Sequence, residues 1–162
     1  MRKITPFFWY DGQAEEAANL YLSLFKNSKL LTKEHAPEGG PWQKGAVMSV
    51  TIQIEEQVLI CFNGGPHFKF TPAVSLMVNC QTQEEVDMLW EKLSEGGHKD
   101  RCGWVNDKYG LSWQIVPDIL LKYLQDKDPV KAKRVMDAMM KMDKLIIADL
   151  KGAYAGEVET KV

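Results

Sequence analysis

The fold is decided by residues 47–63, which read VMSVTIQI, then EE, then QVLICFN. In the first segment apolar and polar residues alternate, as in a strand with one buried face. The polar positions of that alternation are Ser49, Thr51 and Gln53. Glu55-Glu56 then turns the chain, and residues 57–63 return as the partner strand. The stretch predicts a β-hairpin that covers a core with one of its two faces.

A strand and a helix precede this hairpin. Residues 4–10 are β-branched and aromatic, which favours a strand, and Asp11-Gly12 ends the run. Apolar side chains then recur at helical spacing, at Ala17, Leu20, Tyr21, Leu24 and Phe25. A short strand is expected near residues 29–33, before a glycine- and proline-rich loop. Residues 3–65 therefore predict a βαβββ module.

The same order of elements follows a second time. Residues 73–79 predict a strand, and Thr82 with Glu85 forms a capping box that opens a helix. The apolar stripe of that helix is Val86, Leu89, Trp90 and Leu93. Residues 102–105 and 111–116 predict another hairpin, so that residues 72–117 form a second module of βα(β)ββ type.

An internal duplication explains the repeated order. When the chain is shifted by 69 residues, Glu15-Glu16 falls on Glu84-Glu85 and Leu20-Tyr21 falls on Leu89-Trp90. Acidic residues are common where helices begin, because they complement the helix dipole. The recurrence of strand, capped helix and hairpin is a stronger sign of duplication than the acidic pairs.

Helices are expected over residues 118–156. Asp128-Pro129 is a typical helix start, with an N-cap residue before a proline in the first turn. Apolar residues then recur at helical spacing, and this tail could cap a sheet edge or pair with a second subunit. Residues 1–162 are thus predicted to be a single α+β domain of two βαβββ-type modules with a C-terminal helical tail.

Composition restricts the function classes. Of 162 residues, 45% are hydrophobic and 26% charged, with a net charge of −2, so no basic surface for nucleic acid is expected. The chain shows neither a secretory signal nor an apolar run long enough to span a membrane. Its three cysteines, Cys61, Cys80 and Cys102, are widely spaced and predict neither disulfides nor a zinc site. We expect a cytoplasmic protein that binds neither nucleic acid nor membranes.

Several motifs resemble one family of small α+β proteins. They are ITPFFW at 4–9, FNGGPHFKF at 62–70, VNC at 78–80, EEVD at 84–87, CGW at 102–104, DKYG at 107–110 and SWQIVP at 112–117. With them the chain resembles the PhnB-like, or demethylubiquinone methyltransferase-like, family of the vicinal-oxygen-chelate superfamily. That superfamily includes glyoxalases, bleomycin-resistance proteins and extradiol dioxygenases. The resemblance implies two modules forming curved sheets around a cavity, a metal there in active members, and a homodimer.

The sequence contains no cofactor-binding motif that would support the methyltransferase name. Rossmann-type methyltransferases bind their cofactor at a glycine-rich turn between a parallel strand and a helix. The glycine pairs of this chain are Gly39-Gly40, Gly64-Gly65 and Gly96-Gly97, and none stands at such a turn. We therefore expect no cofactor.

Strand alternation predicts which side chains face the cavity. Thr5, Phe7 and Trp9 are assigned to the helix side of the first strand, as are Val74, Leu76 and Val78 of the fifth. The predicted cavity face carries Phe8, Ser49, Thr51, Cys61, Asn63, Ser75, Met77 and Gln114. Positions where relatives hold a metal fall on Ile4, Cys61, Ala73 and Gln114, a poor set of ligands for a hard cation. The usual metal site is therefore expected to be absent.

For four residues two interpretations stay open. His67 is either a structural hydrogen-bonding residue or an acid–base group that contacts ligand. Cys61 is either a small buried residue or a nucleophile. Trp42 and Trp104 either line the ligand mouth or cover the core, whereas Trp9, Trp90 and Trp113 are assigned to the helix-facing core.

These features predict a small-molecule binding protein without the usual metal triad. A small organic molecule would bind among the cavity residues, with His67 and Trp104 nearby. The alternative is an enzyme of the superfamily, of lyase, isomerase or dioxygenase type, or the methyltransferase of the family name. A third reading is a homodimer whose modules serve assembly only. No catalytic residue is assigned.

Overall fold

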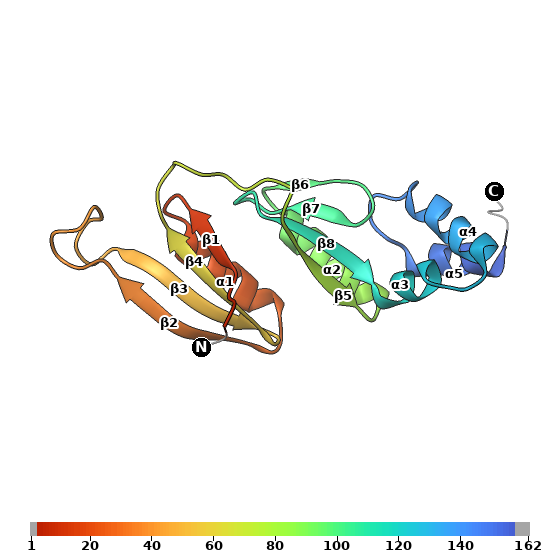
Figure 1. The fold of residues 1–162 in the computed structure, drawn as a ribbon, viewed down its shortest axis with the longest axis horizontal. Coiled ribbons are helices and arrows are strands. Elements are labelled where there is room, and N and C mark those ends of the chain that lie inside the picture. Colours follow the sequence, from red (N-terminus) through yellow and green to blue (C-terminus); the bar gives the residue numbers. More distant parts are fainter. Residues whose placement is uncertain (1–2, 158–162) are drawn as a thin grey trace. The chain divides into compact units, whose positions relative to one another are not determined.

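The computed structural model describes residues 3–157, and the chain folds into two compact units that divide between Phe70 and Thr71. Each unit contains one four-stranded sheet, which a helix covers on one face (Figure 1). This is the α+β architecture with two modules and a C-terminal helical tail that the sequence predicts. The two units are described separately below.

The first unit follows the predicted order of strand, helix and three strands. Its elements are β1 (Phe7–Tyr10), α1 (Ala14–Leu24), β2 (Ser28–His35), β3 (Val47–Ile54) and β4 (Gln57–Asn63). The strand order in the sheet is β1-β4-β3-β2. The β1 strand runs parallel to β4, whereas β3 is antiparallel to both β4 and β2. The hairpin of residues 47–63 has the predicted boundaries.

The core of the first unit lies between the sheet and α1. The helix presents small side chains to the sheet, since Ala14, Ala17 and Ala18 are all fully buried. Small residues allow the helix backbone to approach the strands closely. The strand residues on this face are Val50, Ile52, Ile54, Leu59 and Cys61, all of them buried. Burial of each large aliphatic side chain contributes roughly 1.5–3 kcal/mol to folding.

The predicted face of β1 is wrong. Phe8 is buried, with 6% of its surface exposed, whereas 55% of Phe7 is exposed. Tyr10 shares the face of Phe8, and its hydroxyl lies 3.2 Å from that of Tyr21 on α1. Phe8 therefore faces the helix, and Phe7 and Trp9 point to the other side of the sheet.

Residues 4–10 form an almost wholly apolar run that does not mark a buried face, and the two repeats also differ in length just before their helices. With a shift of 69 residues, Ala14–Leu24 falls within α2 (Gln83–Ser94), as expected. However, three residues separate β1 from α1, whereas two separate β5 (Ser75–Cys80) from α2. The shift that matches the helices is thus off by one in the strands, and a slip of one residue moves every side chain of a strand to the opposite face.

The second unit repeats the topology of the first. After β5 and α2 come β6 (His98–Lys99), β7 (Trp104–Asn106) and β8 (Ser112–Pro117), in the sheet order β5-β8-β7-β6. Its first strand again runs parallel to its last. The predicted cap is present, because the Thr82 hydroxyl accepts a hydrogen bond from the Glu85 amide at 3.2 Å. The predicted helix stripe is buried, as are Trp113 and Ile115 on β8.

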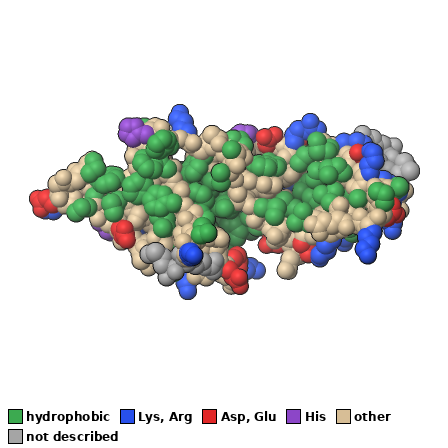
Figure 2. Space-filling model, viewed as in Figure 1, with side chains coloured by type: hydrophobic (Ala, Val, Ile, Leu, Met, Phe, Trp, Pro, Cys, Tyr) green, Lys and Arg blue, Asp and Glu red, His purple; other side chains and the backbone are tan. Residues whose placement is uncertain are grey.

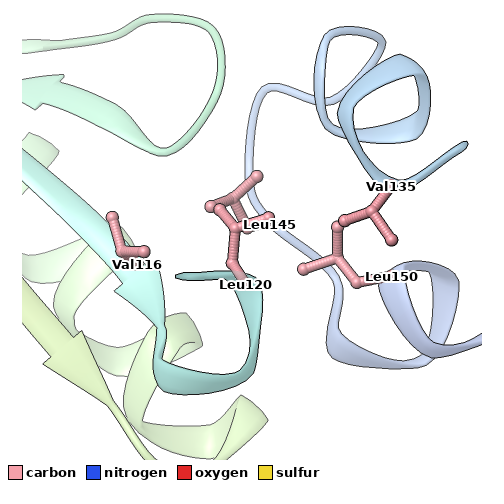
Figure 3. Close-up of a cluster of buried hydrophobic side chains, with 5 residues drawn as sticks. All are labelled: Val116, Leu120, Val135, Leu145 and Leu150. Atoms are coloured by element: carbon pink, nitrogen blue, oxygen red, sulfur yellow. The ribbon is translucent and has the colours of Figure 1, made fainter. Parts of the chain in front are cut away.

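Three helices complete the described chain. They are α3 (Asp118–Leu124), α4 (Pro129–Met139) and α5 (Ile147–Ala155). Asp128 caps α4 as predicted, because its carboxylate accepts a hydrogen bond from the Val130 amide at 2.9 Å. These helices share a core with the end of β8, formed by Val116, Leu120, Val135, Leu145 and Leu150 (Figure 3).

The Gln83 side chain fixes the segment before α5. Its amide nitrogen donates to the Leu145 carbonyl at 3.2 Å, and its amide oxygen accepts from the Ile147 amide at 2.7 Å. The amide group thus pairs with the backbone on both sides of one residue. Among residues 3–157, no helix has the length and apolar character needed to cross a membrane.

Candidate ligand-binding site

The face of the first sheet opposite α1 carries an open hollow of about 840 Å³. Its floor is apolar and comes mainly from β1 and β4, which are parallel neighbours. Phe7 lies opposite Ile60 in that pairing, and Val58 and Phe62 occupy the alternate positions of β4. Hydrophobic side chains gather over the strands of this sheet (Figure 2). An exposed apolar floor of this kind suits an apolar partner.

Polar side chains from β2 and β3 line the other side of the hollow. They are Thr32, Glu34, Ser49 and Thr51. The Ser49 hydroxyl lies opposite Glu34 in the strand pairing and donates a hydrogen bond to its carboxylate at 3.1 Å. Glu34 is the only charged residue among the eleven described residues that line the hollow.

A bulge in β2 shapes this side. The pairing of β2 with β3 shifts between Leu30 and Thr32, so that Leu31 has no direct partner. In a bulge two consecutive residues oppose one on the partner strand. Leu31 and Thr32 consequently both line the hollow.

An aromatic cluster surrounds Phe62 on this face of the first sheet. The Phe62 ring contacts Phe7, Trp9 and Trp42 with centroid distances of 5.2, 5.3 and 5.8 Å. The indole of Trp42 also donates to the Asn63 carbonyl at 2.7 Å, which brings the 36–46 loop against the sheet. Trp42 thus contacts Phe62, which lines the hollow, and its role at a ligand mouth stays a prediction.

Trp9 is held by the glycine pair that follows β4. Its indole nitrogen donates to the Gly65 carbonyl at 2.9 Å. The ring lies so close to Gly64 that a Cβ atom there would overlap it. Trp9 belongs to this open-face cluster, and its predicted place in the helix-facing core is wrong.

The predicted ligand-binding residues of the first unit divide between the two faces. Ser49 and Thr51 line the hollow, and their contact with a ligand stays a prediction. Phe8, Cys61 and Asn63 lie on the helix side, because Cys61 pairs with Phe8 and Asn63 pairs with Tyr10 across β1 and β4. Their predicted placement beside Ser49 is therefore wrong. Cys61 is completely buried, which fits its reading as a small core residue.

Asn63 has a structural role that the sequence did not indicate. Its side-chain oxygen accepts a hydrogen bond from the Ala14 amide at 2.9 Å, and its nitrogen donates to the Val47 carbonyl at 3.0 Å. Both ends of the amide are thus engaged within the fold. His67 is exposed in the turn that follows Gly64-Gly65.

The predicted residues of the second unit do share one face. Gln114 pairs with Met77 on one side and with Trp104 on the other. The Gln114 side chain donates to the Ser75 hydroxyl at 2.8 Å. This face lies opposite the buried Trp113 and Ile115, as the alternation predicts.

The described residues offer few groups that could hold a metal ion or a nucleotide cofactor. Among residues 3–157, no three His, Cys, Asp or Glu side chains lie close enough together to hold a metal ion. The amide at the start of α1 is bonded to Asn63, and the start of α2 is capped by Thr82. A nucleotide cofactor held in the Rossmann manner needs such helix amides free, so these two junctions do not fit one.

Residues that the sequence did not identify make up most of the hollow. They are Thr5, Phe7, Leu31, Thr32, Glu34, Met48, Val58, Ile60 and Phe62. Those from β1 and β4 follow once the face of β1 is corrected. Glu34 lies beyond the strand predicted at 29–33, whereas the observed β2 continues to His35.

Comparison with known proteins agrees with this fold. The model of the 3-demethylubiquinone-9 3-methyltransferase family matches residues 2–116. The chain belongs to this family. The family match ends before α3, so α3, α4 and α5 lie beyond it. A comparison with curated protein sequences finds no match.

Two solved structures are similar to this chain. The PhnB protein from Bacillus cereus is 38% identical with a TM-score of 0.67, over 72% of this chain and 99% of that chain. Protein PA1353 from Pseudomonas aeruginosa is 20% identical with a TM-score of 0.59, over 70% of this chain and 95% of that chain. The first supports both family and fold, and the second supports the fold alone.

Proposed function

We propose that this protein is a cytoplasmic binding protein for a flat, largely apolar small molecule, which binds on the open face of the first sheet. The observation that carries the proposal is the hollow of about 840 Å³ with an apolar floor and a few polar groups on one side. Ligand sites of proteins have this composition, in which apolar walls supply affinity and polar groups fix orientation. Three free cysteines fit a reducing compartment.

The exposed state of the floor supports this function. Phe7 is 55% exposed and Leu31 41% exposed. Large apolar side chains gathered on one face gain free energy when a ligand covers them, at roughly 25 cal/mol per Å² of buried apolar surface. A ligand lying on this face would remove part of this apolar surface from water.

Matched serine substitutions test the site. Binding of 2-naphthylmethanol, a flat neutral ring compound, is measured by isothermal titration calorimetry. Leu31→Ser should weaken binding about fivefold, since it removes roughly 1 kcal/mol of buried apolar contact. Leu30→Ser is the control, because Leu30 is similarly exposed but lies outside the hollow. No binding at millimolar concentration, or equal losses in both variants, would contradict the proposal.

An enzyme of the family is the alternative function. Glu34 is the only acidic or basic side chain among the described residues that line the hollow, so it is the one acid or base they offer. Turnover of a bound compound that disappears in Glu34→Gln would favour the enzyme. Turnover unaffected by that substitution would place any chemistry elsewhere.

The second sheet carries the other predicted ligand-binding residues on one face. Ser75, Met77, Trp104 and Gln114 lie together on its open face, and their contact with a ligand stays a prediction. A homodimer is expected from the family resemblance, and β2 is an edge strand with exposed leucines that a second copy would cover. Size-exclusion chromatography with light scattering tests it.

A further inference from the structure

Glu34 gives the hollow of the first sheet a single negative charge. The residue lies on β2 directly opposite Ser49, whose hydroxyl donates to the carboxylate at 3.1 Å. Ser49 is itself only 6% exposed, so its position is fixed by the sheet. The other residues known to line the hollow, all within 3–157, are uncharged.

No cation neutralises this carboxylate within the part of the chain that the structure describes. The neighbouring Lys33 is bonded instead to Glu15 of α1, on the other side of the sheet. Lys29 does share the open face, since it pairs with Gln53. It lies five residues away along β2, about 16 Å at the rise of a strand, which exceeds the Debye length at physiological salt.

A bound ring would remove water from the carboxylate. A charge that loses its water without gaining a counter-ion costs free energy, whereas a cation supplied by the ligand offsets that loss. The aromatic rings of Phe7 and Phe62 would also favour a cation, because their faces carry negative partial charge. A carboxylate on the ligand would meet repulsion from Glu34 instead.

We propose that the ligand of this hollow is a flat apolar compound that carries a positively charged nitrogen, ammonium or amidinium, and that Glu34 selects it. This inference rests on the proposed binding function and names the class of ligand for it. The Ser49 hydroxyl holds the carboxylate at the polar side, with the apolar floor beside it. The hollow thereby separates cationic from anionic ring compounds of the same size.

Three probes with one ring system test the selection. They are 2-naphthylmethylammonium, 2-naphthylmethanol and 2-naphthoate, each titrated calorimetrically at pH 7 and low salt. The ammonium compound should bind about tenfold more tightly than the alcohol, which corresponds to roughly 1.4 kcal/mol. The naphthoate should bind more weakly than the alcohol. Raising the salt concentration should reduce the differences, because the pair is partly exposed.

The variant Glu34→Gln tests whether Glu34 causes the preference for the ammonium compound. Glu34→Gln keeps an acceptor for Ser49 and should bind all three probes with nearly the affinity that the wild type shows for the alcohol. Glu38→Gln removes one charge from the 36–46 loop, where Glu38 pairs with Lys44, and should keep the wild-type preference. Thermal unfolding of each variant checks that the fold is retained.

The outcomes separate the two proposals. Binding of the alcohol without any preference for the ammonium compound would overturn the charge selection and leave the binding function in place. A preference that survives in Glu34→Gln would likewise overturn the role of Glu34. Failure of all three probes to bind would overturn the binding function itself.

Discussion

The Asn63 side chain at the end of β4 accepts a hydrogen bond from the Ala14 amide at the start of α1, at 2.9 Å. The residue before the helix, Gln13, makes no capping hydrogen bond with its side chain. Asn63, which lies 49 positions away from Ala14 along the chain, therefore caps the helix. The same amide group donates to Val47 of β3, so that one side chain joins the helix to two strands.

Replacing Asn63 should destabilise the first unit. We expect Asn63→Ala to lower the free energy of unfolding by about 1–2 kcal/mol, because it removes the cap and leaves the Val47 carbonyl without this donor. Urea denaturation followed by circular dichroism measures the loss. Asn79→Ala, at an exposed position near the end of β5, serves as the control. Equal stability of Asn63→Ala and wild type would contradict the capping role.

How well the sequence predicts the buried face of a strand depends on how clearly polar and apolar residues alternate along it. In residues 47–54 polar and apolar side chains alternate, so that the boundaries and the buried face of β3 are both predicted correctly. Residues 4–10 are almost all apolar or aromatic, and such a run has no alternation that would distinguish its two faces. Alternation therefore does not fix the face of β1, and the 69-residue shift that matches the helices misplaces this strand by one residue.

The candidate site was predicted less well than the fold for two further reasons. Asn63 is polar at a strand end, which suggests a ligand contact, but helix amides need acceptors as well. The β2 strand carries a bulge, and a bulge leaves no mark in the hydrophobic pattern that would place Leu31 and Thr32 together. Ser49 and Thr51 were found because their strand alternates.

The buried face of α2 can be tested at Trp90. This side chain is 3% exposed, and Trp90→Ala should lower the free energy of unfolding by roughly 3–5 kcal/mol, as truncation of a large core residue does. Met88→Ala on the same helix is the control, since Met88 is 41% exposed. Chemical denaturation measures both changes. A near-neutral effect of Trp90→Ala would mean that the helix is packed in another way.

Stability at alkaline pH should depend on Cys80. Burial, with the nearby charge of Glu85, raises the pKa of the Cys80 thiol to about 12. In the unfolded chain a cysteine loses its proton near pH 8.5, about the value of a free thiol. Between these two pH values the unfolded state binds fewer protons than the folded state. The thiol's contribution is thus complete at neutral pH and falls as pH rises, by at most about 1.4 kcal/mol per unit.

Comparison with Cys80→Ala isolates this contribution. Lysine and tyrosine residues also titrate in alkaline solution, so the informative quantity is the difference in unfolding free energy between wild type and variant at each pH. That difference should shrink from pH 8 to pH 11 as the wild type loses stability faster. A constant difference across this range would show that the Cys80 thiol ionises equally well in both states.

The orientation of β1 can be tested with two neighbouring phenylalanines. Phe8→Ser should lower the free energy of unfolding by about 3 kcal/mol or more, because Phe8 is buried and packs edge-on against Phe70 with ring centroids 5.9 Å apart. Phe7→Ser should change stability much less, since its ring is largely exposed, and should weaken 2-naphthylmethanol binding several-fold because that ring forms part of the floor. Urea denaturation and calorimetry give the two quantities for each variant. If Phe7→Ser unfolds the protein while Phe8→Ser leaves it stable, the strand faces the other way, and Ile60 and Phe62 no longer share a surface with Phe7.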